Sequence, residues 1–236
     1  MKKYLITMGG IPVGKSRWTE LGVTRNYETE VMRLFHSCPV GYFNGIFKYD
    51  NDWIKETEYY KDPKAKMVLD EPSFGWAFKG ICVLDMLNKV DDGDVVMWVD
   101  SNHVIKSNLD PIVNFAVEHG AFLHEHWQIV FPNKEWTHRD TFIGMGCDEE
   151  RYWNARQIQV NVMAFCKTEF TMNLVNEWVK YCTDYDVVIQ NKYENLEGFK
   201  NHRHEQSILS ILVEKYKIPY QIDPYQIVYE MDIIRA

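Results

Sequence analysis

Asp94-Val95-Val96-Met97-Trp98-Val99-Asp100-Ser101-Asn102-His103 is the stretch that decides the fold of this chain. Its apolar, strand-forming run ends abruptly in a carboxylate, a hydroxyl, an amide and an imidazole. A buried strand that delivers polar groups at its carboxyl end is how open α/β sheets build ligand sites. We therefore expect a central buried strand over residues 94–99, with residues 100–103 facing a ligand.

Length and composition are those of a globular protein with a net negative charge. The 236 residues suit one large α/β domain or two small ones. Hydrophobic residues make up 46% and charged residues 25%, as in ordinary globular proteins. The net charge of −8 argues against a nucleic-acid binder, because phosphate backbones are held by clustered lysines and arginines. An anionic ligand would need a local site or a metal to supply positive charge.

Cysteine usage and hydropathy give an expectation about the compartment. The five cysteines are odd in number, widely spaced and free of any C-x-x-C pair. This pattern predicts reduced thiols in a cytosolic protein and not a disulfide framework or a zinc site. No segment approaches the roughly 20 apolar residues that span a bilayer, and the N-terminus does not resemble a signal peptide. We therefore expect a cytoplasmic protein without a transmembrane anchor.

Strands and helices alternate along the chain. Hydrophobic periodicity predicts strands at residues 4–8, 41–49, 94–99, 121–123, 157–165 and 220–222. It predicts helices at residues 24–37, 74–90, 108–120, 168–181 and 206–216. Residues 50–70 resemble a surface helix and loop broken by Pro63, and residues 124–155 a long irregular binding loop. This alternation, without a repeat or linker, predicts a single α/β domain over residues 1–236.

The polar tip of the central strand is the first candidate for chemistry. Asp100 and Asn102 point the same way along an extended chain, so both can reach one cation. Mn²⁺ or Mg²⁺ suits these oxygen ligands, and His103 or a distant histidine could complete the shell of a manganese ion. The alternative is that Asp100 and Ser101 only cap the turn after the strand.

A second candidate is the stretch Gly9-Gly10-Ile11-Pro12-Val13-Gly14-Lys15-Ser16, a formal match to the phosphate-binding pattern G-x-x-x-x-G-K-[ST]. It follows a predicted strand, as that pattern requires. Residues 17–24 are a poor start for the helix that should follow, because they contain Gly22 and β-branched residues. A P-loop nucleoside triphosphatase or kinase is therefore an alternative, and a glycine-rich turn is the simpler interpretation.

The third candidate is the stretch His202-Arg203-His204-Glu205-Gln206-Ser207 at the start of an amphipathic helix. Such a helix start suits anion or metal binding, but Glu205 and Ser207 could equally have capping roles. Arg139 and Asp140, in the irregular segment, could bind a ligand or only brace their loop.

Taken in order, several segments resemble the GT-A class of nucleotide-sugar glycosyltransferases. The likeness is to the retaining members around the plant xyloglucan xylosyltransferases and fungal α-mannosyl- and galactosyltransferases, and to small capsule-type and chlorovirus-encoded transferases. The segments that carry it are a W-x-x-K helix, a strand ending in a D-x-D-like motif, a later strand with an asparagine, and an acidic-Gln-Ser helix start: Trp76-Ala77-Phe78-Lys79, Asp94 to Asn102, Gln159 to Phe165, and His204 to Ser207.

The resemblance implies a single GT-A (Rossmann-like, nucleotide-binding) domain with a mixed, mostly parallel central sheet flanked by helices. It also implies a metal-dependent glycosyltransferase that moves a hexose from a nucleoside-diphosphate sugar, with UDP-hexose favoured, to a glycan or glycoprotein acceptor with retention. A sugar-nucleotide-binding module with a decayed catalytic site is a further alternative, because Asn102 stands where the second aspartate of D-x-D is expected.

The resemblance also implies roles for individual residues. Mn²⁺ (or Mg²⁺) would bind Asp100 and Asn102, with His204, His202 or water completing the shell, since no histidine follows His204. The catalytic set around the anomeric carbon would be Gln159, Asn161 and Glu205. The nucleotide sugar would contact Thr7, Met8, Gly9, Lys79, Asp100 and Ser101, with Arg139 and Asp140 as further candidates from the loop.

Overall fold

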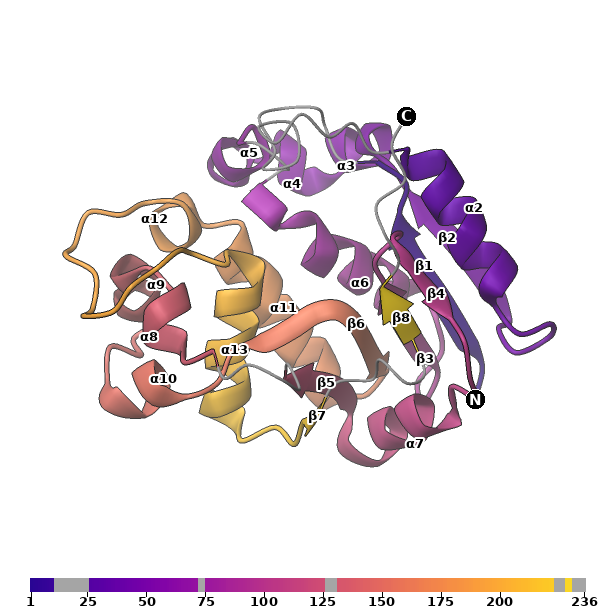
Figure 1. The fold of residues 1–236 in the computed structure, drawn as a ribbon. Helices are drawn as coiled ribbons and strands as arrows, with labels where there is room; N and C mark the ends of the chain where they lie inside the picture. Colours follow the sequence, from indigo (N-terminus) through magenta and orange to yellow (C-terminus); the bar gives the residue numbers. More distant parts are fainter. Residues whose placement is uncertain (11–25, 72–74, 126–130, 223–227, 231–236) are drawn as a thin grey trace.

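A six-stranded mixed sheet forms the centre of the computed structural model, which describes residues 1–10, 26–71, 75–125, 131–222 and 228–230 (Figure 1). The strand order is β2-β1-β3-β6-β5-β7. The β1–β2, β1–β3 and β5–β7 pairs are parallel, whereas β6 runs antiparallel to both β3 and β5. The strands are β1 (Lys3–Met8), β2 (Gly45–Tyr49), β3 (Val95–Val99), β5 (Ala121–Glu125), β6 (Ile158–Cys166) and β7 (Gln221–Ile222). The expected mixed, mostly parallel sheet is confirmed.

Helices cover both faces of the sheet (Figure 1). One face carries α6 (Phe78–Lys89), α11 (Glu169–Cys182) and α13 (Glu205–Tyr216), and the other carries α2 (Tyr27–Ser37) and α7 (Asp110–His119). The central strand β3 is buried along its whole length. Val96 and Trp98 belong to the first core, and Val95, Met97 and Val99 to the second. Because successive side chains of a strand point to opposite faces of the sheet, β3 contributes to the cores on both faces.

The residues beside β3 show why the strand begins where it does. Gly93 has a φ of 82° in the turn that leads into the strand, a conformation that favours glycine. The Asp94 side chain then accepts a hydrogen bond of 2.6 Å from the Lys2 backbone N–H, which joins the start of β1 to the start of β3. The predicted helix after β3 is confirmed as α7, with Pro111 in its first turn and Gly120 at its end.

Several short helices lie in the segments where the sequence predicts a broken surface helix and loop or an irregular loop. They are α3 (Asn51–Glu56), α4 (Glu58–Lys61), α5 (Pro63–Leu69), α8 (Asn133–Trp136), α9 (Arg139–Gly144), α10 (Glu150–Asn154) and α12 (Tyr185–Val188). The expectation of one long irregular loop over residues 124–155 is therefore corrected. Helices of four to seven residues are too short to display a clear 3.6-residue period, and tertiary contacts stabilise them.

A small two-stranded sheet of β4 (His103–Ile105) and β8 (Val228–Glu230) follows the tip of β3. This pairing was not predicted from the sequence. The predicted strand over residues 41–49 is shorter than expected, because β2 starts at Gly45 after a turn. The five cysteines are free thiols, as predicted. Among the described helices, none is long and apolar enough to cross a membrane. The assignment of residues 1–236 to one domain stays a prediction.

Candidate functional site

Lys79 and Asp100 form an ion pair at the carboxyl end of β3. Lys79 Nζ, from the first turn of α6, lies 3.0 Å from Asp100 Oδ1 and 3.1 Å from Oδ2. Trp98 Nε1 donates a hydrogen bond of 2.7 Å to Asp100 Oδ1. The lysine also donates to the Val160 carbonyl oxygen at 3.2 Å. Both carboxylate oxygens of Asp100 are thus held by donors.

Glu205 joins this pair from the first turn of α13. Its Oε1 lies 3.8 Å from Lys79 Nζ, and the side chains of Glu205 and Lys79 are each 6% exposed. The Asp100 side chain is 28% exposed, so it is the most accessible member of the cluster. Lys79, Asp100 and Glu205 therefore form one buried charged cluster that reaches solvent through Asp100.

Burial raises the pKa of Glu205 to about 7, although the nearby Lys79 ammonium partly opposes this rise. At neutral pH the carboxyl group thus exists in both its protonated and its ionised form. A group in this condition can accept or deliver a proton within the physiological pH range.

The turn after β3 links the site to α2. Ser101 Oγ donates a hydrogen bond of 3.1 Å to Glu30 Oε2, and Glu30 is fully buried. On the neighbouring strand β1, Thr7 Oγ1 is buried without a hydrogen-bond partner among the described residues. Gly9 follows Met8 and donates its backbone N–H to the Tyr49 carbonyl oxygen at 2.7 Å. Parallel pairing of β1 and β3 therefore brings residues 7–9 to the same sheet edge as Asp100.

Asn102, His103, Asn161 and His124 form a chain of hydrogen bonds. His103 Nδ1 lies 2.9 Å from Asn102 Oδ1, and His103 Nε2 lies 3.1 Å from Asn161 Nδ2. His124 Nε2 lies 3.0 Å from Asn161 Oδ1. All three contacts are satisfied when His103 carries its proton on Nδ1 and His124 on Nε2. Both imidazoles are almost completely buried, so this chain is an ordered internal network.

Asn161 meets the Lys79 cluster through its backbone, because its carbonyl oxygen accepts a hydrogen bond of 2.8 Å from the Asp100 N–H, whereas its side chain bonds His103 and His124. The His124 ring lies beside that of Phe122, two residues earlier on β5. Phe122 belongs to the core on the sheet face covered by α2 and α7. The register between β5 and β6 shifts beside Asn161, where Gln159 pairs with His124. Gln159 is half-buried, and its side chain makes no hydrogen bond to another described residue. Among the described residues, neither the Gln159 nor the Asn161 side chain makes a hydrogen bond to Glu205.

His204 lies in a group of three histidines at the start of α13. The His138 and His202 rings stack with centroids 4.3 Å apart, and the His202 and His204 centroids are 4.9 Å apart. His202 Nδ1 accepts a bond from the His138 backbone N–H, and its Nε2 donates to the Val188 carbonyl oxygen. Burial lowers the pKa of His204 to about 4, with the nearby His138 adding to the effect. The His204 imidazole is therefore neutral at physiological pH.

The loop candidates Arg139 and Asp140 make contacts within their own region. The Asp140 carboxylate accepts bonds of 2.9 to 3.0 Å from the backbone N–H groups of Lys192 and Tyr193. Arg139 pairs with Asp148 at 3.2 Å. These bonds correspond to the bracing alternative, in which the two residues hold the loop together.

Each candidate metal ligand contacts another side chain in this structure. Asp100 is bound by Lys79 and Trp98, Asn102 bonds His103, and the His204 ring lies tilted beside that of His202. Over the described part of the chain, no three or more His, Cys, Asp or Glu side chains are arranged to hold a metal ion.

A small cavity of about 40 Å³ lies at the strand tip, lined by Met8, Tyr27, Trp76, Phe78, Lys79, Trp98, Asp100 and Ser101. It has room for little more than one water molecule. Of the Gly9–Ser16 motif, residues 11–16 lie outside the described residues. Trp98 and Glu30, which bond Asp100 and Ser101, were not among the predicted site residues. The position of Trp98 two residues before Asp100 on the same strand face could have indicated its role.

Comparison with known proteins supports the fold. No family model and no curated protein matches the sequence. Among solved structures, the chain is similar to the apo form of mouse xyloside xylosyltransferase 1, with a TM-score of 0.51 and 10% sequence identity. The match covers 95% of this chain and 86% of that chain. At this identity the likeness shows a glycosyltransferase-like α/β fold and leaves the activity to be established from the site.

Proposed function

We propose that this protein is a glycosyltransferase that moves a hexose from a nucleoside-diphosphate sugar, with UDP-hexose favoured, to a glycan or glycoprotein acceptor with retention. The observation that carries the proposal is the Lys79–Asp100–Glu205 cluster at the carboxyl end of the central strand. Ligands of open α/β sheets bind at this edge, and the fold is similar to that of a xylosyltransferase.

Lys79 has the charge that the reaction needs. Transfer releases a nucleoside diphosphate, and a fixed cation beside the leaving group stabilises the negative charge that develops on it. Thr7, Met8 and Gly9 share this sheet edge, where we propose that they contact the nucleobase and ribose. Ser101 is proposed to hold the nucleotide or sugar. Arg139 and Asp140 remain candidates for contact with the nucleotide sugar, although in this structure they bond to Asp148 and Lys192.

Glu205 is the strongest candidate among the proposed catalytic residues. Its buried position and its pKa of about 7 suit a group that steadies a positively charged sugar when ionised. In a retaining reaction the acceptor approaches from the leaving-group face, and a phosphate oxygen can take its proton. Gln159 and Asn161 remain proposed neighbours of the donor sugar. Asn161 is less available to bond a sugar, because its side-chain amide is hydrogen-bonded to His103 and His124.

A divalent cation, Mn²⁺ or Mg²⁺, is also part of the proposal, with Asp100, Asn102 and His204 as its candidate ligands. Such an ion would offset diphosphate charge as a Lewis acid. It would compete with Lys79 for the Asp100 carboxylate, because the ammonium already lies about 3 Å from both oxygens. Donor binding also requires the side chains around the 40 Å³ cavity to move apart.

The direct experiment is to incubate the protein with a panel of UDP- and GDP-hexoses, with and without Mn²⁺, and to measure release of the nucleoside diphosphate. The proposal predicts release above background, and loss of that release in Asp100→Ala. NMR of the first-formed glycoside tests the stereochemistry, because an inverted anomer rules out retention.

A sugar-nucleotide-binding module without transfer activity is the second candidate. The pairing of Asp100 with Lys79 and of Asn102 with His103 favours it, because these contacts occupy groups that transfer would use. This candidate predicts nucleotide binding without donor hydrolysis or transfer.

A further inference from the structure

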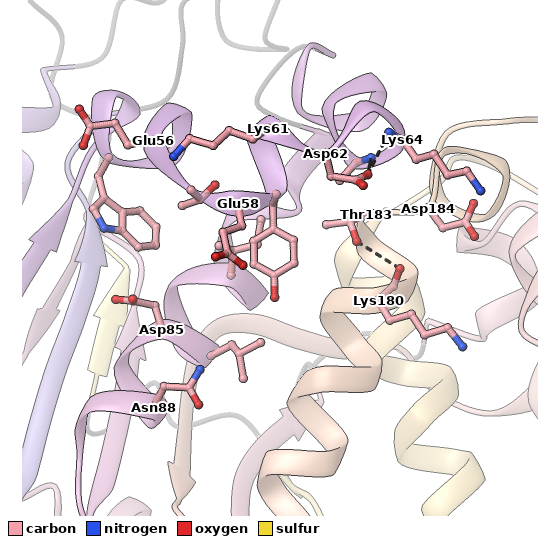
Figure 2. A pocket seen from close by; sticks show the side chains of 16 residues that line it. Glu56, Glu58, Lys61, Asp62, Lys64, Asp85, Asn88, Lys180, Thr183 and Asp184 are labelled. Carbon is pink, nitrogen blue, oxygen red and sulfur yellow. Dashed lines mark hydrogen bonds between the residues drawn. The ribbon is translucent and has the colours of Figure 1, made fainter.

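A large cavity lined by described residues has no part in the proposed reaction. It has a volume of about 980 Å³ and lies between α3, α4 and α5 on one side and α6 and the end of α11 on the other (Figure 2). This volume is at the upper end of the range for small-ligand sites. We call this cavity the α6 groove.

The α6 groove lies on the opposite side of α6 from the candidate active site. Ile81, Leu84, Asp85 and Asn88 line it, and their spacing places them on one helix face. Lys79 precedes Ile81 by two residues, which turns it about 200° away around the helix axis. A ligand in the groove is therefore separated from Asp100 by the helix itself.

The charges of the groove exclude a nucleotide as its ligand. Acidic side chains outnumber basic ones, and they are Glu56, Glu58, Asp62, Asp85 and Asp184 against Lys61, Lys64 and Lys180. A diphosphate would be repelled by the net negative charge. The mixture of carboxylate acceptors and ammonium and amide donors instead matches hydroxyl groups, which both donate and accept.

Aromatic rings give the groove an apolar surface. Trp53 and Tyr59 line it and are half-buried, and Trp53 is held against Tyr49 with ring centroids 4.4 Å apart. Trp53 also lines an adjoining cavity of about 400 Å³, together with Tyr4 and Phe47. An aromatic side chain that is already fixed by its neighbours loses little conformational entropy when a ligand packs on it. The two adjoining cavities together suit an extended ligand.

Several polar groups in the groove are available to a ligand. Both hydrogen bonds to Asp85, from Tyr49 and Lys89, end on its Oδ2. The side chains of Glu58 and Asn88 make no hydrogen bond to any residue that the structure describes. Figure 2 shows Glu58 on α4 facing the side of the cavity formed by Asp85 and Asn88.

We propose that the α6 groove binds a neutral oligosaccharide, whose rings pack on Trp53 and Tyr59 and whose hydroxyls bond to Glu58, Asp85 and Asn88. This groove is a carbohydrate-binding site separate from the reaction centre. In the proposed transferase it would hold a distant part of a glycan acceptor, but sugar binding there does not depend on transfer.

Calorimetric titration of the full chain with maltohexaose, xylohexaose and mannohexaose tests the proposal. We expect saturable binding of at least one of them, weakened about tenfold or more in Glu58→Ala/Asn88→Ala. Both replaced side chains are exposed, so the fold should be unaffected. The matched control is Asn114→Ala/Glu118→Ala, an exposed pair with the same residue types on α7, which should bind as the wild type does.

Two results would overturn the proposal: no binding of any of the three sugars at millimolar concentration, or binding that the Glu58/Asn88 variant leaves unchanged. Saturable binding of pentalysine in place of the sugars would also overturn it, because it would identify a basic peptide as the ligand. Asp100→Ala should bind the oligosaccharide normally. Sugar binding by a wild type that binds no nucleoside diphosphate would therefore refute the proposed function alone.

Discussion

Lys79 Nζ lies within 3.1 Å of both carboxylate oxygens of Asp100, and its side chain is almost completely buried. An ammonium ion in such a position is favourable only because carboxylates compensate its charge. Asp100 and Glu205 supply this compensation. The same cation is well placed to meet the diphosphate of a donor at the end of β3.

Replacing Lys79 with Met should reduce transfer about a hundredfold or more, because it removes a preorganised positive charge from the leaving group. Initial rates with saturating donor measure this effect. The matched control is Lys89→Met on the same helix, where the lysine pairs with Asp85 at the surface. Equal rates in the two variants would contradict the role of Lys79.

Glu205 should make folding stability depend on pH. Its pKa is about 7 in the folded chain and about 4.3 in an unfolded chain. Between these values the folded state binds a proton that the unfolded state has lost, so its contribution falls as pH rises from about 4.3 to 7. The full loss is on the order of 3 kcal/mol.

Urea unfolding of the wild type and Glu205→Gln across this pH range tests the effect. The two buried histidines at the start of α13 titrate with the opposite sign, because their pKa values are lowered. The difference between the two proteins therefore isolates Glu205. A difference that does not vary with pH would mean that the carboxyl group has an ordinary pKa.

The Asn161 network should contribute to stability. Asn161→Ala removes one hydrogen-bond partner from each of two buried imidazoles, and a buried polar atom left unsatisfied costs about 1 to 3 kcal/mol. Urea unfolding should show a loss of this size. Asn176→Ala serves as the control, because that side chain donates only to the Met172 carbonyl oxygen on the exposed surface of α11. This replacement should change the free energy of unfolding by less than about 0.5 kcal/mol. Equal effects would show that the network is energetically neutral.

His204 has a backbone conformation that favours glycine, with φ 45° and ψ −117°. Gln206 donates its backbone N–H to the Arg203 carbonyl oxygen across it, and the angles are close to those of the first central residue in a type II′ turn. His204→Gly should therefore be more stable than His204→Ala by about 1 kcal/mol. Both variants lack the ring, so thermal unfolding of the pair measures backbone strain alone. A more stable alanine variant would show that the turn is unstrained.

The sequence was most informative where one segment determines its own structure. The apolar run of β3 and the three-residue steps of Phe78, Ile81 and Leu84 predicted a buried strand and a buried helix, and both are present. Long periodic segments carry this information because burial on one face repeats along them.

Other features were beyond sequence reasoning for a physical reason. The short helices of residues 51–69 and 133–154 lack a period, and the β4–β8 pair joins segments more than a hundred residues apart. Lys79 was expected at the site only through the family resemblance. The chain from His103 through Asn161 to His124 depends on a register shift in β6, which no residue pattern indicates.

The central claim is that the tip of β3 binds a nucleoside diphosphate. The most direct test is the melting temperature of the wild type and Asp100→Ala with UDP, in the presence and absence of Mn²⁺. At a UDP concentration about a hundred times its dissociation constant, the wild type should melt roughly 5 to 10 °C higher, and Asp100→Ala should show no such rise. An unchanged melting temperature of the wild type under both conditions, or an equal rise in the variant, would contradict the claim.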